Sequence, residues 1–184
     1  MTTAAERARA GRRWGARDYA YGGLFGAAAL LLPTIFHLLH LGSVFLPMYV
    51  PLVALGFLVR PGAAACTALL VPLISAALTG MPPFYPPVAV VMAVELAVMA
   101  GLIAVATARW PGTNPWTILV PALVVGRVLN LGLTYVTAAT LGLPARAVTL
   151  ASLLGGWPGL VLMIATVPPV VKAIRASGEL NVRA

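Results

Sequence analysis

Two charged side chains, Glu95 and Arg127, stand inside the long apolar segments 88–108 and 115–140. A charge at the middle of a bilayer costs about 2.5–3.5 kcal/mol on insertion scales, so it is kept paired or facing water and marks a functional site by default. Two interpretations stay open. Glu95 and Arg127 form either an ion pair that fixes the packing of these segments or the polar floor of a substrate cavity.

Two histidines, His37 and His40, are spaced so that they share one face of the apolar segment 19–40, near its outer end. The spacing suits a metal ion, but two ligands without a nearby Cys, Asp or Glu are a weak metal signal. We favour interfacial histidines that hydrogen-bond to external loops, with a role at the rim of a ligand site as a further interpretation. We therefore predict no metal site.

A proline-rich connector covers residues 80–87 and contains four prolines. Because proline fixes φ, we expect an extended, stiff chain that presents Met81, Phe84 and Tyr85 on the outer face. Such a loop covers a ligand at low entropic cost. A rigid linker between two membrane spans would have the same composition.

Three further side chains stand at a depth where their polar atoms need partners. Asn130 and Tyr135 lie in the outer half of segment 115–140, and Trp157 lies within segment 147–171 beside several glycines. Either helix packing or a ligand supplies those partners. Together with the preceding residues they complete the predicted substrate-binding set.

Catalytic motifs are missing from the sequence. It has no GxxxxGK[ST] loop, and Lys172 is its one lysine, so we predict no ATPase site in this chain. HExxH, GxSxG and paired carboxylates within the apolar segments are missing as well, so we expect no enzyme. The single cysteine, Cys66, permits no intrachain disulfide.

The composition determines which elements must position these side chains. Of 184 residues, 61% are hydrophobic and 9% are charged, whereas soluble domains carry about 25% charged residues. With a mean hydropathy of +0.98, the chain is expected to be an integral membrane protein rather than a soluble enzyme domain. The apolar runs do not alternate in polarity, which favours membrane-spanning helices over a β-barrel.

Proline and glycine divide the sequence into six predicted spans, so we predict an all-α membrane protein with six transmembrane helices. The second and third spans are expected to be short and broken by proline, at Pro47, Pro51 and Pro72. A basic N-terminal tail (1–18) and a C-terminal tail (172–184) would flank the membrane domain (19–171). The predicted spans are 19–40, 45–59, 63–78, 88–108, 115–140 and 147–171.

The distribution of the formal charge of +8 indicates how the chain is oriented in the membrane rather than a patch that binds nucleic acid. With the N-terminus inside, the tails and the second and fourth connectors hold ten of the 12 Lys and Arg residues. The external connectors hold Arg146 alone. The positive-inside rule then predicts that both termini are cytoplasmic, in the cell membrane of a prokaryote.

Small residues recur on the first span, as Gly22-xxx-Gly26 and Gly23-xxx-Ala27. This spacing permits close approach of another helix. The partner is either a helix of the same chain or another membrane protein.

Several segments, in this order, resemble the substrate-binding S-component of energy-coupling factor (ECF) vitamin transporters, and the resemblance extends from about residue 19 to residue 171. It is closest to the group that includes cobalamin-specific members. The resembling segments are HLGSVFLPMYVPLVALG (40–56), VPLISAALTGMPPFYPP (71–87), residues 92–101 with Glu95, Gly126-Arg127, Trp157-Pro158-Gly159 and Val167-Pro168.

The resemblance implies a protein that captures a vitamin or related micronutrient, cobalamin or a smaller molecule, on the external side. It would work with a transmembrane T-component and two cytoplasmic ATPases that use ATP, and it would hold no intrinsic cofactor. Gly22, Gly23, Gly26 and Ala27 would then contact the partner. Two alternatives stay open: a small metal- or haem-binding membrane protein that uses His37 and His40, and a ligand-free interaction subunit.

Overall fold

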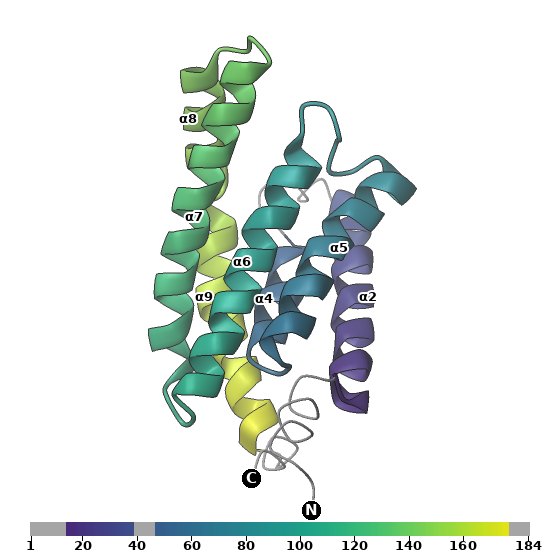
Figure 1. Cartoon of the computed structure of the whole chain (residues 1–184), viewed down its shortest axis with the longest axis vertical. Helices are drawn as coiled ribbons and strands as arrows, with labels where there is room; N and C mark the ends of the chain where they lie inside the picture. The colour runs from purple at the N-terminus through teal and green to yellow at the C-terminus, as the bar shows by residue number, and fades with distance from the viewer. Residues whose placement is uncertain (1–13, 39–46, 177–184) are drawn as a thin grey trace, which may run out of the picture.

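The computed structural model describes residues 14–38 and 47–176, and every regular element among them is a helix. This confirms the all-α prediction for the described part of the chain (Figure 1). The helices are α2 (Ala16–Leu38), α4 (Tyr49–Gly56), α5 (Pro61–Thr79), α6 (Val88–Arg109), α7 (Pro115–Thr140), α8 (Ala145–Gly155) and α9 (Trp157–Ala176).

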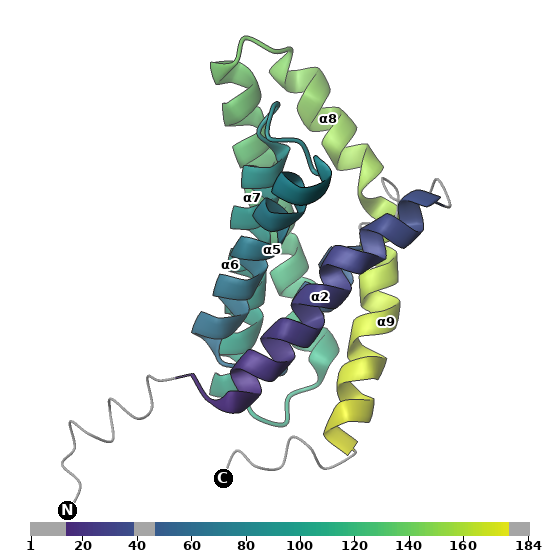
Figure 2. The same ribbon diagram turned by 90° about the vertical axis from the view of Figure 1, so that its right-hand side faces the viewer.

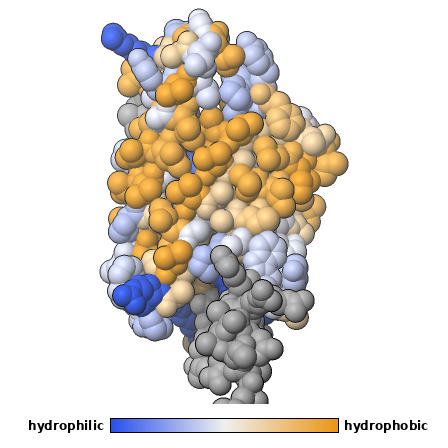
Figure 3. All heavy atoms as spheres, viewed as in Figure 1, coloured by the Kyte–Doolittle hydropathy of each residue, from blue (hydrophilic) through white to orange (hydrophobic). Residues whose placement is uncertain are grey.

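Within residues 14–38 and 47–176, four segments are long and apolar enough to cross a membrane: α5, α6, α7 and the stretch Ala145–Ala176 formed by α8 and α9. On the face shown in Figure 3, apolar side chains cover the middle and more hydrophilic ones gather toward both ends. These are the properties of a multi-pass membrane protein. The count of six crossings and the orientation in the membrane stay predictions.

The short helix α4 forms the centre of the packing, in contact with α2, α5, α6 and α9. Its eight residues rise about 12 Å, less than the roughly 30 Å of a hydrocarbon core, so α4 alone does not cross a bilayer. Seven of the eight are buried, as expected for a helix that is apolar on all sides. At Gly56 an added Cβ would lie 2.8 Å from the carbonyl oxygen of Ala100, so the two backbones approach closely.

The second predicted span holds a short helix, as expected, and Pro47 lies before that helix begins. Pro51 and Pro72 do not break their helices, which corrects the prediction for these two positions. Pro51 lies in the first turn of α4, where backbone N–H groups have no intrahelical acceptor and proline costs no hydrogen bond. The 19-residue helix α5 continues through Pro72. Pro72 is buried, and packing against neighbouring helices offsets the loss of one helical hydrogen bond.

The break falls instead in the sixth predicted span, which is two helices rather than one. Helix α8 ends at Gly155, α9 begins at Trp157, and Figure 2 shows α8 inclined to α9. Pro158 follows the break and has no N–H to donate to the preceding turn. The sequence therefore interrupts the helix at this point. From the end of α7, α8 runs obliquely back toward α9 (Figure 2) and contacts α7.

One end of the helix bundle gathers the start of α2, the α4–α5 connector, the α6–α7 connector and the end of α9. The buried Asp18 carboxylate accepts a hydrogen bond from the Arg60 backbone N–H at 2.9 Å, which joins α2 to the start of α5. The Arg175 side chain donates to the Thr113 carbonyl oxygen at 3.1 Å, and the Lys172 ammonium lies 4.3 Å from the centre of the Trp116 ring. These are the connectors that the charge pattern groups as cytoplasmic.

Candidate ligand-binding site

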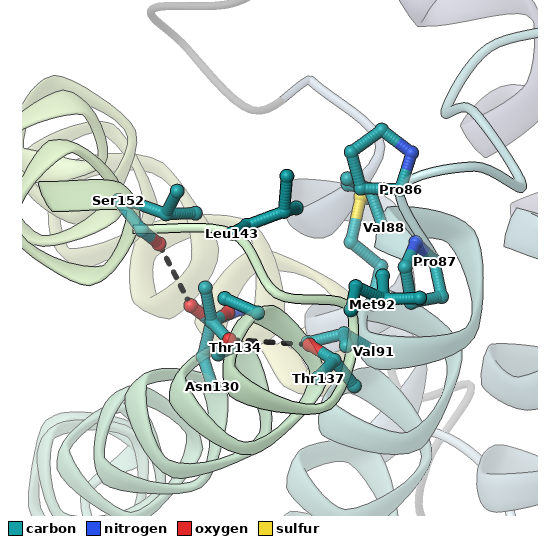
Figure 4. A pocket seen from close by; sticks show the side chains of 13 residues that line it. Pro86, Pro87, Val88, Val91, Met92, Asn130, Thr134, Thr137, Leu143 and Ser152 are labelled. Carbon is teal, nitrogen blue, oxygen red and sulfur yellow. Dashed lines mark hydrogen bonds between the residues drawn. The ribbon is translucent and has the colours of Figure 1, made fainter. Parts of the chain in front are cut away.

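A pocket of about 240 Å³ lies between the start of α6, the second half of α7, the α7–α8 connector and α8 (Figure 4). It is at the opposite end of the bundle from the basic connectors, and the last two residues of the proline-rich connector form part of its wall. Its lining residues are Pro86, Pro87, Val88, Val91, Met92, Asn130, Thr134, Thr137, Ala138, Leu141, Leu143, Val148 and Ser152.

The polar part of the wall comes from α7 and α8. The Ser152 hydroxyl donates to the Asn130 Oδ1 atom at 3.0 Å, and this bond joins the two helices on one side of the pocket (Figure 4). The Thr137 hydroxyl donates to the carbonyl oxygen of Leu133 at 2.8 Å. One helix therefore places Asn130 and Thr137 two turns apart along a largely apolar wall.

A buried carboxylate lies directly behind Asn130. The Asn130 Nδ2 atom donates to Glu95 Oε2 at 2.8 Å, and the Tyr49 hydroxyl donates to the same oxygen at 2.6 Å. Only 3% of Glu95 is exposed. The single oxygen Oε2 thus accepts two hydrogen bonds, which fix the orientation of the Asn130 amide. With the bond from Ser152 to Asn130, they connect α4, α6, α7 and α8 through one polar network.

Arg127 contacts the backbone where α8 ends and α9 begins and does not form an ion pair with Glu95. Its Nη2 atom donates to the Ser152 carbonyl oxygen at 3.1 Å, and its guanidinium lies so close to Gly156 that a Cβ atom there would overlap it. The carbonyl at the end of α8 thus gains a cationic donor at the point where the helix is interrupted.

The direct Glu95–Arg127 ion pair is not formed, because within the described residues the ion pair found is Arg60–Asp18, with 3.7 Å between nitrogen and oxygen. Glu95 and Arg127 instead face a cavity of only about 10 Å³, which they share with Tyr49 and four apolar residues. A cavity of this size holds at most about one water molecule. The ion-pair interpretation is therefore wrong, and the two side chains act through separate partners.

The remaining predicted substrate-binding side chains lie outside the pocket. Met81, Phe84 and Tyr85 are exposed at the tip of the proline-rich connector, and Tyr135 and Trp157 are exposed on α7 and α9. None of these five lines the pocket. A ligand role for them stays a prediction.

The proline-rich connector is folded back rather than extended, which corrects the expectation of an extended chain. It turns at residues 84–87, and the Ala89 N–H donates to the Pro83 carbonyl oxygen at 3.1 Å. The Ser75 hydroxyl donates to the Met81 carbonyl oxygen at 2.7 Å. These hydrogen bonds hold the connector against α5 and place Pro86 and Pro87 over the pocket.

The histidine prediction falls largely outside the described residues. His40 lies in the segment 39–46, and for His37 only the backbone in α2 is described. Within the described part of the chain no group of three or more His, Cys, Asp or Glu side chains could hold a metal ion. The roles of His37 and His40 stay predictions.

The small-residue pattern on α2 divides between two faces. Gly22 and Gly26 pack against α5, because an added Cβ would lie 3.1 Å and 3.5 Å from Thr67 side-chain atoms. Gly23 and Ala27 are exposed. The structure therefore leaves Gly23 and Ala27 free for a partner and uses the other two glycines inside the chain.

The sequence did not identify Tyr49, Thr137 or Ser152 as site residues. Tyr49 and Ser152 are isolated polar groups in apolar surroundings, and that is the signal that would have selected them. Thr137 carries no such signal, because helical threonines commonly bond to their own backbone.

Comparison of the chain with protein-family models, with curated proteins and with solved structures gives no match. What the protein binds must therefore be inferred from the residues of the site.

Proposed function

We propose that this protein is the substrate-binding membrane subunit of an ECF-type importer, which captures a vitamin or related micronutrient on the external side. One observation carries the proposal: a pocket of about 240 Å³ whose amide, Asn130, is anchored on the buried Glu95 carboxylate. The pocket lies at the end of the bundle that the charge pattern predicts to be external.

The composition of the wall supports binding of a small molecule. Ligand sites are mostly apolar concavities with a few well-placed polar groups, and they usually measure about 300–1,000 Å³. At about 240 Å³, this pocket is slightly smaller than that range. Its size favours a small vitamin or precursor over cobalamin, whose macrocycle and nucleotide loop need a much larger space.

Preorganisation supports the same proposal. The Asn130 amide is held on one side by Glu95 and on the other by the Ser152 hydroxyl. A buried side chain with this many partners loses little conformational entropy when it binds a ligand. Simple helix packing would not require an amide at the wall of a cavity.

Energy for import would come from partners. The sequence has no ATPase motif, so the proposal includes a transmembrane T-component and two cytoplasmic ATPases that use ATP. The exposed Gly23 and Ala27 on α2 form a small-residue surface on which a helix of the T-component can approach closely.

Calorimetry with a panel of vitamins tests the proposal on the purified full-length protein in detergent. Val148→Phe places a bulky ring in the pocket wall, and Val128→Phe makes the same change at a position that is 66% exposed. We expect at least one vitamin to bind the wild type and Val128→Phe, with at least tenfold weaker binding to Val148→Phe.

Two results would contradict the proposal. Absence of binding by every vitamin in the panel would favour a ligand-free interaction subunit. Equal binding to Val148→Phe and Val128→Phe would show that the ligand binds outside this pocket.

A further inference from the structure

We infer that the pocket selects ligands by their hydrogen-bond donors and excludes anions, so that its substrate is a small, largely apolar ring bearing an amino or hydroxyl group. The inference rests on the proposed function, because it assigns the substrate class of that site. It follows from the hydrogen bonds that the polar groups of the pocket wall already donate within the protein.

The hydroxyl protons of Ser152 and Thr137 are both engaged within the protein. Ser152 donates to Asn130 Oδ1 at 3.0 Å, and Thr137 donates to the carbonyl oxygens of Leu133 and Thr134 at 2.8 Å and 3.1 Å. Each hydroxyl has one proton and two lone pairs. Toward the pocket, Ser152 and Thr137 therefore offer acceptors.

The Asn130 amide follows the same pattern. One of its two N–H groups donates to Glu95 Oε2, which requires that Oδ1 be the atom facing Ser152 (Figure 4). Oδ1 keeps a second lone pair for a ligand, and Nδ2 keeps its second N–H. The Thr134 hydroxyl, on the same wall, rotates to serve as donor or acceptor, so acceptors predominate among these polar groups.

The charges around the pocket disfavour an anion. Within the part of the chain that the structure describes, no lysine, arginine or histidine lines the pocket. The Glu95 carboxylate is hydrogen-bonded to the Asn130 amide on the side away from the pocket. The Arg127 guanidinium is held at the Ser152 carbonyl and against Gly156. A carboxylate or phosphate in the pocket would lose its hydration without gaining a cationic partner, which is costly in an apolar site.

The rest of the wall is apolar. Pro86, Val91, Met92, Leu143 and Val148 supply apolar surface opposite and beside the polar groups. Figure 4 shows the proline and α6 side chains on one side, with Asn130, Thr137 and Ser152 on the other. A ring therefore lies against the apolar side and directs its donors toward α7 and α8.

Three probes with one ring and one variable group test the inference: benzylamine, benzyl alcohol and benzoate. Each is titrated at millimolar concentration into the purified full-length protein, and saturable binding is measured by ligand-observed NMR. We expect benzylamine and benzyl alcohol to bind and benzoate to bind at least tenfold more weakly.

A threonine pair gives the matched variants. Thr137→Val removes a pocket acceptor without changing the side-chain shape. Thr140→Val removes the hydroxyl of an exposed threonine that bonds to its own helix at 2.9 Å and does not line the pocket. We expect Thr137→Val to weaken benzylamine binding about fivefold, the usual effect of one hydrogen bond, and Thr140→Val to leave it unchanged.

The outcomes separate this inference from the proposed function. If a vitamin binds but benzoate binds as well as benzylamine, the preference for hydrogen-bond donors over anions (the donor rule) is overturned and the importer proposal stands. If benzylamine is preferred but no vitamin binds, the donor rule stands and the importer proposal falls. Failure of all three probes to bind, or equal effects of the two threonine variants, overturns the inference.

Discussion

The hydrogen bond from Tyr49 to Glu95 joins the central helix α4 to α6, and its removal should weaken the whole bundle. Tyr49→Phe deletes only the hydroxyl group, which lies 2.6 Å from Glu95 Oε2. Tyr49 is 4% exposed and Glu95 is 3% exposed. Water therefore does not readily replace the missing donor.

The expected loss follows from the kind of bond. Hydrogen bonds to charged groups contribute about 1.5–3 kcal/mol in proteins, whereas measured interhelical bonds in membranes average about 0.6 and reach about 1.7 kcal/mol. Because Glu95 keeps a second donor in Asn130 at 2.8 Å, we expect the lower part of the first range. We predict a loss of about 1.5 kcal/mol, or roughly 3–6 °C in Tm for a chain of this size.

Thermal unfolding of the purified protein in one detergent, followed by far-UV circular dichroism, measures the loss. The matched control is Tyr135→Phe, which deletes the hydroxyl of a tyrosine that is 47% exposed and should change stability by less than about 0.5 kcal/mol. Equal melting temperatures for Tyr49→Phe and Tyr135→Phe would refute the claim that the buried network stabilises the bundle.

Two further predictions concern the helix break and the topology. Gly156→Ala should destabilise the protein by about 1–3 kcal/mol, because the new Cβ displaces the Arg127 guanidinium from its hydrogen bond to the Ser152 carbonyl oxygen. Gly132→Ala, where an added Cβ meets nothing within 4 Å, should leave stability unchanged or raise it by up to about 1 kcal/mol in the same melting assay. A lower melting temperature for Gly132→Ala than for Gly156→Ala would contradict the assigned position of Arg127. In a cysteine-free background, a membrane-impermeant maleimide applied to intact cells should label Arg146→Cys and not Arg109→Cys, and labelling of Arg109→Cys alone would reverse the predicted orientation.

The long helices could be predicted closely from the sequence. The segments expected at 88–108 and 115–140 are observed as Val88–Arg109 and Pro115–Thr140. Proline and glycine bound these segments, and their interiors are largely apolar, so local chemistry alone determines where they begin and end.

Where a proline breaks a helix could not be predicted from the sequence. Pro72 and Pro158 look alike as interruptions of apolar segments, yet α5 continues through Pro72 and the chain breaks just before Pro158. The difference lies in neighbours that are distant in the sequence. Packing covers Pro72, whereas the Arg127 guanidinium occupies the space beside Gly156.

The candidate site was predictable only in part, for a similar reason. Asn130 and Glu95 were identifiable because polar groups are rare in apolar segments. The partner of Arg127 is the backbone carbonyl of Ser152, and a carbonyl acceptor leaves no mark in the sequence. Tyr49 reaches Glu95 only because α4 is the buried centre of the fold.

The central claim is that the pocket beside Asn130 holds a small-molecule substrate. Mass spectrometry of the molecules released on denaturing the purified protein tests it most directly, with Val148→Phe and Val128→Phe prepared in parallel. We predict one small compound that bears a hydrogen-bond donor, recovered from the wild type and Val128→Phe and lost from Val148→Phe. Recovery of no such compound, or of equal amounts from Val148→Phe, would contradict the claim.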